Sequence, residues 1–137
     1  MLVDDNDTDN YLNKTVIERA GISNEIVIKN SGLSALEYFQ RNLNNPDQVP
    51  DLLFLDINMP IVDGYGFLKE FKNYPANIKN KCNIVVLSSS SSKSDFTRMA
   101  ADHNVDNYFT KPLSKEDLKN LKDNVKHMPK TPGGWDI

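Results

Sequence analysis

The chain has few of the residues that build disulfide frameworks or metal clusters. Its 137 residues include one cysteine and two histidines. Because Cys82 has no second thiol to pair with, a disulfide framework and a thiolate site for zinc or iron are both excluded, which fits a reducing compartment. We therefore expect a cytoplasmic protein.

Long apolar runs are also missing. The longest, residues 52–55 and 84–87, are far shorter than the roughly 20 residues that a membrane-spanning helix needs. The N-terminus leads directly into acidic residues and not into the apolar stretch of a signal peptide. These features predict a soluble protein with no membrane partner.

An excess of positive charge is the third absence. Lys and Arg number 16 against 19 Asp and Glu, so the formal net charge is −3. A surface that follows nucleic-acid phosphates needs clustered basic side chains. We therefore expect no nucleic-acid partner, and a site that attracts cations.

What the sequence does contain is an alternation of short apolar runs with segments of helical periodicity. The runs predict five strands, at residues 1–3, 25–29, 51–56, 83–88 and 107–110. Most of these runs are continuously apolar, which is typical of parallel strands buried on both faces. The sequence thus predicts a single α/β domain, with a parallel sheet covered by helices on both faces.

Five helices are expected, each with an apolar stripe that faces the core. The stripes are Leu12, Val16 and Ala20; Leu33, Leu36, Phe39 and Leu43; Phe67, Leu68 and Phe71; Phe96, Met99, Ala100 and His103; and Leu118, Leu121 and Val125. Residues 73–83, which contain Pro75, are interpreted as a long surface loop. Residues 1–127 then form the domain, and the Pro- and Gly-rich residues 128–137 are expected to form a flexible tail.

Polar side chains follow the predicted strands at the ends where ligands bind in an open parallel sheet. They are Asp4 and Asp5 after the first strand, Asp56 at the end of the third, Ser88 at the end of the fourth and Lys111 after the fifth. Three carboxylates in one pocket repel one another, and Mg²⁺ relieves this because it prefers oxygen ligands. We predict that Asp4, Asp5 and Asp56 bind Mg²⁺ together with the carbonyl of Asn58.

A carboxylate held against Mg²⁺ can attack phosphorus and form an aspartyl phosphate. Lys111 and Ser88 can then donate hydrogen bonds to the phosphoryl oxygens. Each residue also has a simpler interpretation, because an Asp pair after a strand is commonly a helix cap and a Lys before Pro112 can be a solvated turn residue. Their joint placement at successive strand ends favours the phosphoryl-acceptor site.

These segments resemble the receiver domains of two-component response regulators, of the single-domain, chemotaxis-regulator type. Residues 2–6 resemble the acid-pair segment of that family, and residues 53–60 with Asp63 and Gly64 its phosphoacceptor segment. Residues 85–88 are similar to its hydroxyl segment, and residues 108–112 to its Lys-Pro segment. The resemblance covers nearly the whole chain and implies the doubly wound, flavodoxin-like strand order 2-1-3-4-5.

The resemblance implies a signalling role and not an enzyme with its own substrate. A sensor histidine kinase or histidine phosphotransfer protein would donate the phosphoryl group to Asp56. The side chains of Ser88 and Tyr108 would then change conformation. The face made by the fourth helix, fifth strand and fifth helix would change its binding partner as a result. The resemblance assigns tuning of the phosphoryl lifetime to Asn58 and Ser90; both are small, so we expect a short lifetime. We expect a monomer or weak dimer.

The first strand departs from the pattern of the receiver family. Receivers usually have a longer first strand than residues 1–3, which suggests that Met1 is internal to a longer product.

Two other classes of protein are alternatives to a receiver. An aspartyl-phosphate phosphatase would need a second acid at the position of Asn58. A flavin-binding module would use residues 88–92 to cradle a phosphate, which the nearby Asp cluster would repel. We expect His103 and His127 to be structural or exposed, not phosphodonors.

Overall fold

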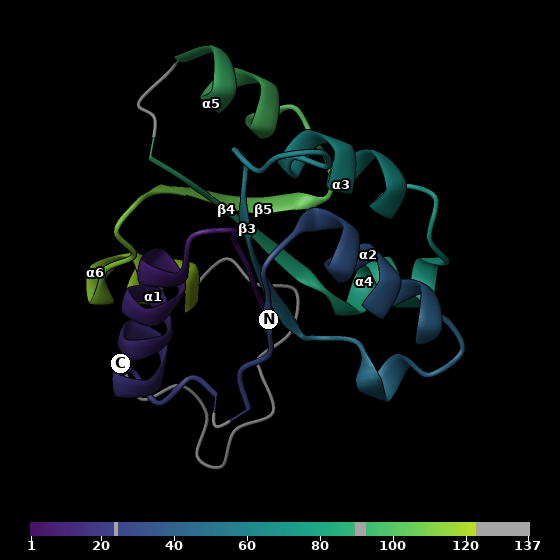
Figure 1. Ribbon diagram of the computed structural model, residues 1–137, viewed down its shortest axis with the longest axis horizontal. Helices are drawn as coiled ribbons and strands as arrows, with labels where there is room; N and C mark the ends of the chain where they lie inside the picture. The colour runs from purple at the N-terminus through teal and green to yellow at the C-terminus, as the bar shows by residue number, and fades with distance from the viewer. Residues whose placement is uncertain (24, 90–92, 123–137) are drawn as a thin grey trace.

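The computed structural model describes residues 1–23, 25–89 and 93–122, and it confirms the predicted fold class (Figure 1). Five parallel strands form one sheet in the order β2-β1-β3-β4-β5. The strands are β1 (Leu2–Val3), β2 (Ile28–Lys29), β3 (Leu52–Asp56), β4 (Asn83–Ser88) and β5 (Val105–Thr110). The predicted tail lies outside the described residues, as do Ser90, Val125 and His127.

Six α-helices and one short 3₁₀ helix accompany the strands in the described part of the chain. They are α1 (Asp7–Arg19), α2 (Gly32–Arg41), η1 (Pro46–Gln48), α3 (Gly64–Phe71), α4 (Ala76–Lys81), α5 (Lys93–Ala100) and α6 (Lys115–Lys122). Figure 1 shows α1 and α6 on one side of the sheet and α2 and α3 on the other. None of these helices is long and apolar enough to cross a membrane.

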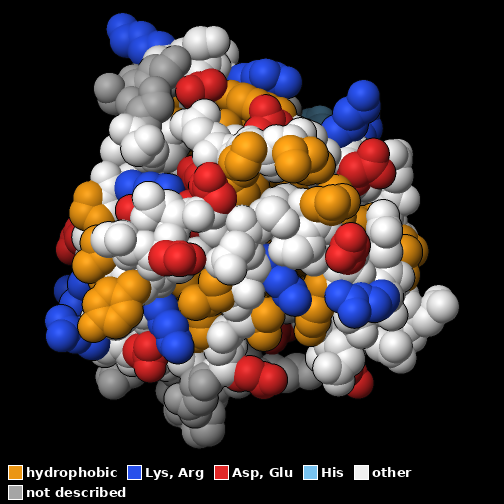
Figure 2. Space-filling view, in the orientation of Figure 1, with side chains coloured by type: hydrophobic (Ala, Val, Ile, Leu, Met, Phe, Trp, Pro, Cys, Tyr) orange, Lys and Arg blue, Asp and Glu red, His pale blue; other side chains and the backbone are white. Residues whose placement is uncertain are grey.

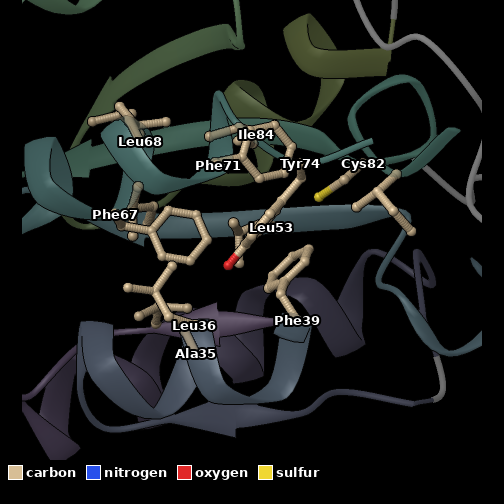
Figure 3. Packing of buried hydrophobic residues seen from close by; sticks show 14 of the residues in the cluster. Ala35, Leu36, Phe39, Leu53, Phe67, Leu68, Phe71, Tyr74, Cys82 and Ile84 are labelled. Atoms are coloured by element: carbon tan, nitrogen blue, oxygen red, sulfur yellow. The ribbon is translucent and has the colours of Figure 1, made fainter. Parts of the chain in front are cut away.

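The central strand β3 separates two hydrophobic cores. Its side chains alternate between the faces of the sheet, so that Leu53 and Leu55 enter one core and Leu52 and Phe54 the other. The first core is built around aromatic rings from α2, α3 and the segment after α3, which Figure 3 shows packed over β3. Those rings belong to Phe39, Phe67, Phe71 and Tyr74, with centroids 5.7 to 6.1 Å apart. Because both faces are covered, polar groups of β3 can reach solvent only at the strand ends.

The second strand is shorter than predicted. We expected residues 25–29, yet only Ile28–Lys29 pair as a strand. The reason is that β2 is an edge strand whose one neighbour, β1, supplies only Leu2 and Val3 to the ladder. The fifth strand instead begins two residues early, at Val105, where a register irregularity opposite residues 84 and 85 admits an extra residue.

The loop predicted at residues 73–83 contains a helix, so that prediction is wrong. Helix α4 begins after Pro75, where a missing N–H costs no hydrogen bond, and it buries Ile78 completely. A helix of six residues with one buried apolar side chain has no periodicity that a sequence pattern could reveal. The residues assigned to that loop also include Asn83, which begins β4.

Several predicted helical stripes are also wrong in part. In α1 the buried face carries Asn10, Asn13 and Ile17, whereas Leu12 is 46% exposed. Leu33 in α2 and Phe96 in α5 are half exposed, and Met99 is the buried side chain of α5. The two buried asparagines of α1 bond to loops beside the sheet edge, so polar residues occupy a face that the apolar pattern assigned to leucine.

On the face seen in Figure 2, acidic and basic side chains lie interspersed over the surface. This mixture agrees with the formal net charge of −3. A denser group of charged side chains lies at the carboxyl ends of the strands.

Candidate functional site

The sheet brings the predicted acidic residues together at the carboxyl ends of its strands. Asp4 follows β1, and Asp56 is the last residue of β3, paired in register with Leu87 of β4. Oxygen atoms from Asp4, Asp5 and Asp56 all lie within 4.8 Å of one another. Asp4 and Asp56 are only 3% and 4% exposed, whereas Asp5 is exposed. The site is therefore a largely buried carboxylate cluster with one acid open to solvent.

Hydrogen bonds from the N-cap and first turn of α1 fix Asp4. Its Oδ1 accepts from the backbone N–H of Asn6, and its carbonyl accepts from the amide nitrogen of Asn10, both at 2.9 Å. Asn6 also caps α1 by accepting from the backbone N–H of Asp9 at 2.9 Å. The start of α1 thus holds the acidic residues in place.

The ammonium of Lys111 is the cationic centre of the site. Its Nζ lies 2.6 Å from Asp4 Oδ2, 2.9 Å from Asp9 Oδ2 and 3.3 Å from Asp56 Oδ1. The backbone N–H of Lys111 donates to the carbonyl of Ser88 at 2.8 Å, which fixes this residue beside the end of β4. The bond between Lys111 and Pro112 is cis.

Asp9 was missed by the sequence analysis. It lies in the first turn of α1, which begins at residue 7, and an acidic residue in the first turn of the helix that follows the acid pair is the signal that could have found it. The predicted acid-pair segment, residues 2–6, ends before Asp9.

Burial and crowding shift the ionisation of the two central groups. Burial, followed by the charge of Asp4, raises the pKa of Asp56 to about 6, although Lys111 and the backbone N–H of Asn58 oppose this rise. Burial alone would lower the pKa of Lys111, but hydrogen bonds to Asp4 and Asp9 and the charge of Asp56 hold it above its usual value. One ammonium therefore faces more negative charge than it can neutralise, which favours binding of a further cation.

The other predicted residues lie around this centre. Ser88 is fully buried at the end of β4, and Asn58 is exposed two residues after Asp56. Tyr108 in β5 is partly buried, and its ring packs edge-on against Phe96 of α5 with centroids 5.5 Å apart. Its hydroxyl is enclosed and has no hydrogen-bond partner among the described residues.

A cavity of about 460 Å³ lies at the opposite end of the strands, where β1 and β3 begin. Its lining includes Met1, Ile22, Glu25, Tyr38 and Leu52. The acidic cluster and Lys111 do not line it.

The chain matches a known protein family. The family model that describes the response regulator receiver domain matches residues 1–122 of this chain. The chain belongs to this family. This confirms the resemblance read from the sequence and its assignment to two-component signal transduction. The match ends five residues before the domain boundary predicted at residue 127, which stays a prediction.

Three related proteins illustrate the match. The probable methanogenesis regulatory protein FilR2 of Methanothrix harundinacea is 32% identical over 126 residues, covering 92% of this chain and 79% of that protein. A two-component response regulator from Cytophaga hutchinsonii has a crystal structure with a TM-score of 0.81 and 34% identity, covering 89% of this chain and 91% of that one.

The third relative is the response regulator Rcp1, whose sequence from Synechocystis is 33% identical over 121 residues, covering 86% of this receiver and 79% of Rcp1. The structure of its Mn²⁺-bound form has a TM-score of 0.67 and 30% identity, covering 88% of this chain and 85% of that chain. In each of these matches the chain covers 79% or more of the relative's length.

Proposed function

We propose that this receiver accepts a phosphoryl group on Asp56 in a Mg²⁺-dependent reaction and thereby switches its partner-binding surface. The observation that carries the proposal is the placement of Asp56, buried at the end of β3 within 4.8 Å of two further carboxylates and 3.3 Å from the Lys111 ammonium. The donor would be a sensor histidine kinase or a histidine phosphotransfer protein. The protein would act as a monomer or weak dimer in the cytoplasm, where a chain with a single cysteine fits the reducing conditions.

The donor set fits Mg²⁺. Asp4, Asp5 and Asp56 offer only carboxylate oxygens, which are hard ligands suited to Mg²⁺ or Mn²⁺ rather than to softer metals. We assign the backbone carbonyl of Asn58 as a further ligand. The crystal structure of the Mn²⁺-bound form of the relative Rcp1 supports binding of a divalent ion by a receiver of this family. A bound Mg²⁺ would offset negative charge on the transferring group.

The proposed reaction transfers the group from nitrogen to oxygen. A carboxylate oxygen of Asp56 attacks phosphorus, the P–N bond of the donor phosphohistidine breaks, and the imidazole leaves with its electron pair and takes up a proton from water. With a pKa of about 6, Asp56 is mainly ionised at neutral pH and can act as the nucleophile. Lys111 and Ser88 would donate hydrogen bonds to the phosphoryl oxygens, so that the protein contributes positioning and electrostatics.

We assign the readout to Ser88 and Tyr108. Ser88 would turn its hydroxyl toward the phosphoryl group, and Tyr108 would report this change through its contact with Phe96 on α5. Phe96 is 54% exposed, so a change at this ring alters the surface of α5, β5 and α6 directly. A downstream protein would bind that surface, and this is the partner change proposed for the switch.

The aspartyl phosphate should be short-lived, because Asn58 and Ser90 are too small to keep water from the phosphorus. Phosphate release from the purified phosphorylated protein would measure this lifetime. A lifetime of many hours would contradict the assignment. Asn58 also argues against a phosphatase with its own substrate, because an amide cannot serve as general acid and base.

The function is tested by incubating the protein with acetyl phosphate, with and without Mg²⁺, and measuring intact mass. We expect one phosphoryl group per chain with Mg²⁺ and none after chelation. Asp56→Asn should abolish the added mass, whereas Asp47→Asn, an exposed carboxylate in η1 at the other end of β3, should not. Labelling that persists in Asp56→Asn would place the acceptor elsewhere.

A further inference from the structure

Asp9 contacts Lys111 from outside the carboxylate cluster. Its Oδ2 lies 2.9 Å from Lys111 Nζ, and its side chain is 33% exposed. Asp9 is not one of the three acids whose oxygens gather within 4.8 Å. Its backbone is fixed by the hydrogen bond that its N–H donates to the Asn6 side chain at 2.9 Å. The contact therefore joins a rigid helix start to the one ammonium of the site.

The ammonium of Lys111 has three hydrogens, and three carboxylates surround it. Asp4 and Asp56, at 2.6 and 3.3 Å, are also the groups to which a cation and a phosphoryl group would bind. Once these two groups are engaged, Asp9 is the acceptor that stays available to Lys111. A flexible four-carbon side chain needs such an anchor, because otherwise its ammonium can swing into solvent.

We propose that Asp9 is a positioning residue for phosphoryl transfer: it anchors Lys111 at the mouth of the site so that the remaining N–H groups face the phosphoryl group on Asp56. Asp9 acts through Lys111 and does not touch the reacting atoms. This inference rests on the proposed function of Asp56. It concerns the position of the Lys111 ammonium during phosphoryl transfer and not the affinity of the site for a metal ion.

Asp9 also has a simpler role, because an acidic side chain in the first turn of a helix interacts favourably with the helix dipole. Asp7 lies in the same first turn and supplies a matched control. Asp9→Asn and Asp7→Asn each remove one negative charge from the start of α1. Only Asp9→Asn removes a carboxylate that contacts Lys111.

The test measures the initial rate of labelling by acetyl phosphate across a range of Mg²⁺ concentrations. We expect Asp9→Asn to lower the rate at saturating Mg²⁺ by about three- to tenfold, because a misplaced donor stabilises the transition state less. Asp7→Asn should leave that plateau unchanged. If Asp9→Asn changes only the Mg²⁺ concentration at half-maximal rate, or if both variants lose the same amount, the proposal is overturned.

A double-mutant cycle identifies the route of the effect. Lys111→Ala should slow labelling by itself, and adding Asp9→Asn in that background should cause no further loss, because its target is gone. Additive losses would overturn the proposal. If the wild-type protein takes no label on Asp56, the proposed function fails; if it is labelled and Asp9→Asn matches it, only the role of Asp9 fails.

A second readout does not depend on activity. In the Mg²⁺-bound protein, the side-chain ammonium of Lys111 should give a slowly exchanging signal in ¹⁵N NMR, assigned by its loss in Lys111→Ala. Asp9→Asn should broaden or remove this signal, whereas Asp7→Asn should keep it. An ordered ammonium in Asp9→Asn would show that Asp9 is not the anchor. Backbone spectra of the same samples report whether each variant is folded.

Discussion

The hydroxyl of Tyr65 in α3 donates a hydrogen bond to Asp95 Oδ1 in α5 over 2.6 Å. The guanidinium of Arg98, also in α5, lies over the same ring at 3.5 Å from its centroid. Burial, followed by the hydrogen bond to Asp95, raises the pKa of Tyr65 to about 12, so the hydroxyl stays a donor at physiological pH. Since Met99 is the buried side chain of α5, this polar contact holds the helix against the domain.

We expect Tyr65→Phe to loosen α5, because the substitution keeps the ring beneath Arg98 and removes only the hydrogen bond to Asp95. The free energy of unfolding should fall by about 1–2 kcal/mol. Amide hydrogen exchange should accelerate in α5.

Tyr38→Phe is the matched control, since its hydroxyl donates to the carbonyl of Gln48 at 2.7 Å, away from α5. It should leave exchange in α5 unchanged. Equal protection of α5 in Tyr65→Phe and the wild type would show that the hydrogen bond does not hold the helix.

Lys111 offsets the repulsion between buried carboxylates, so its replacement by Met should destabilise the metal-free protein. Breaking a largely buried ion pair leaves its partners uncompensated, and we expect a loss of about 2–4 kcal/mol at pH 7. Urea denaturation measures this loss, and Mg²⁺ should restore more stability to Lys111→Met than it adds to the wild type. Lys115→Met, an exposed lysine at the start of α6, should change little. A metal-free Lys111→Met as stable as the wild type would contradict this electrostatic role.

The ionisation of Asp56 predicts an unusual pH dependence of stability. Its pKa in the folded protein, about 6, lies above the ordinary value of 3.8, so the folded state binds this proton more tightly than the unfolded state. The resulting stabilisation is fully present below pH 4 and is lost as the pH rises through 6. A shift of about two pKa units corresponds to about 3 kcal/mol.

Asp56→Asn isolates this contribution because it cannot titrate. Without Mg²⁺, the wild type should lose about 2–3 kcal/mol relative to Asp56→Asn between pH 4 and pH 7, measured by urea denaturation at several pH values. Parallel pH profiles for the two proteins would rule out the raised pKa. Asp56→Asn should accordingly be the more stable protein at neutral pH.

Much of the site could be predicted because it follows from one topological rule. Continuous apolar runs identify parallel strands, and the carboxyl ends of such strands share an edge, which is enough to bring Asp4, Asp56 and Lys111 together. Asp9 could not be placed in the same way, because its contact depends on where α1 begins and on how far the Lys111 side chain extends.

The errors in the fold have a common physical cause. In α1, Asn10 and Asn13 are buried because they bond to the backbone of the site, so hydrophobic periodicity points to the wrong face. In α4, a single buried isoleucine gives no period at all. Patterns of apolar residues predict helices and strands that are positioned by hydrophobic packing. They fail where hydrogen bonds or a short tertiary contact determine how the element packs.

The most direct test of the account is to locate the phosphoryl group. The protein is labelled with acetyl phosphate and Mg²⁺, reduced with borohydride, which converts an aspartyl phosphate to homoserine, and digested for peptide mass spectrometry. We predict homoserine at position 56 only, and none when Mg²⁺ is omitted. Homoserine at Asp4, Asp5 or Asp9, or equal conversion without Mg²⁺, would contradict it.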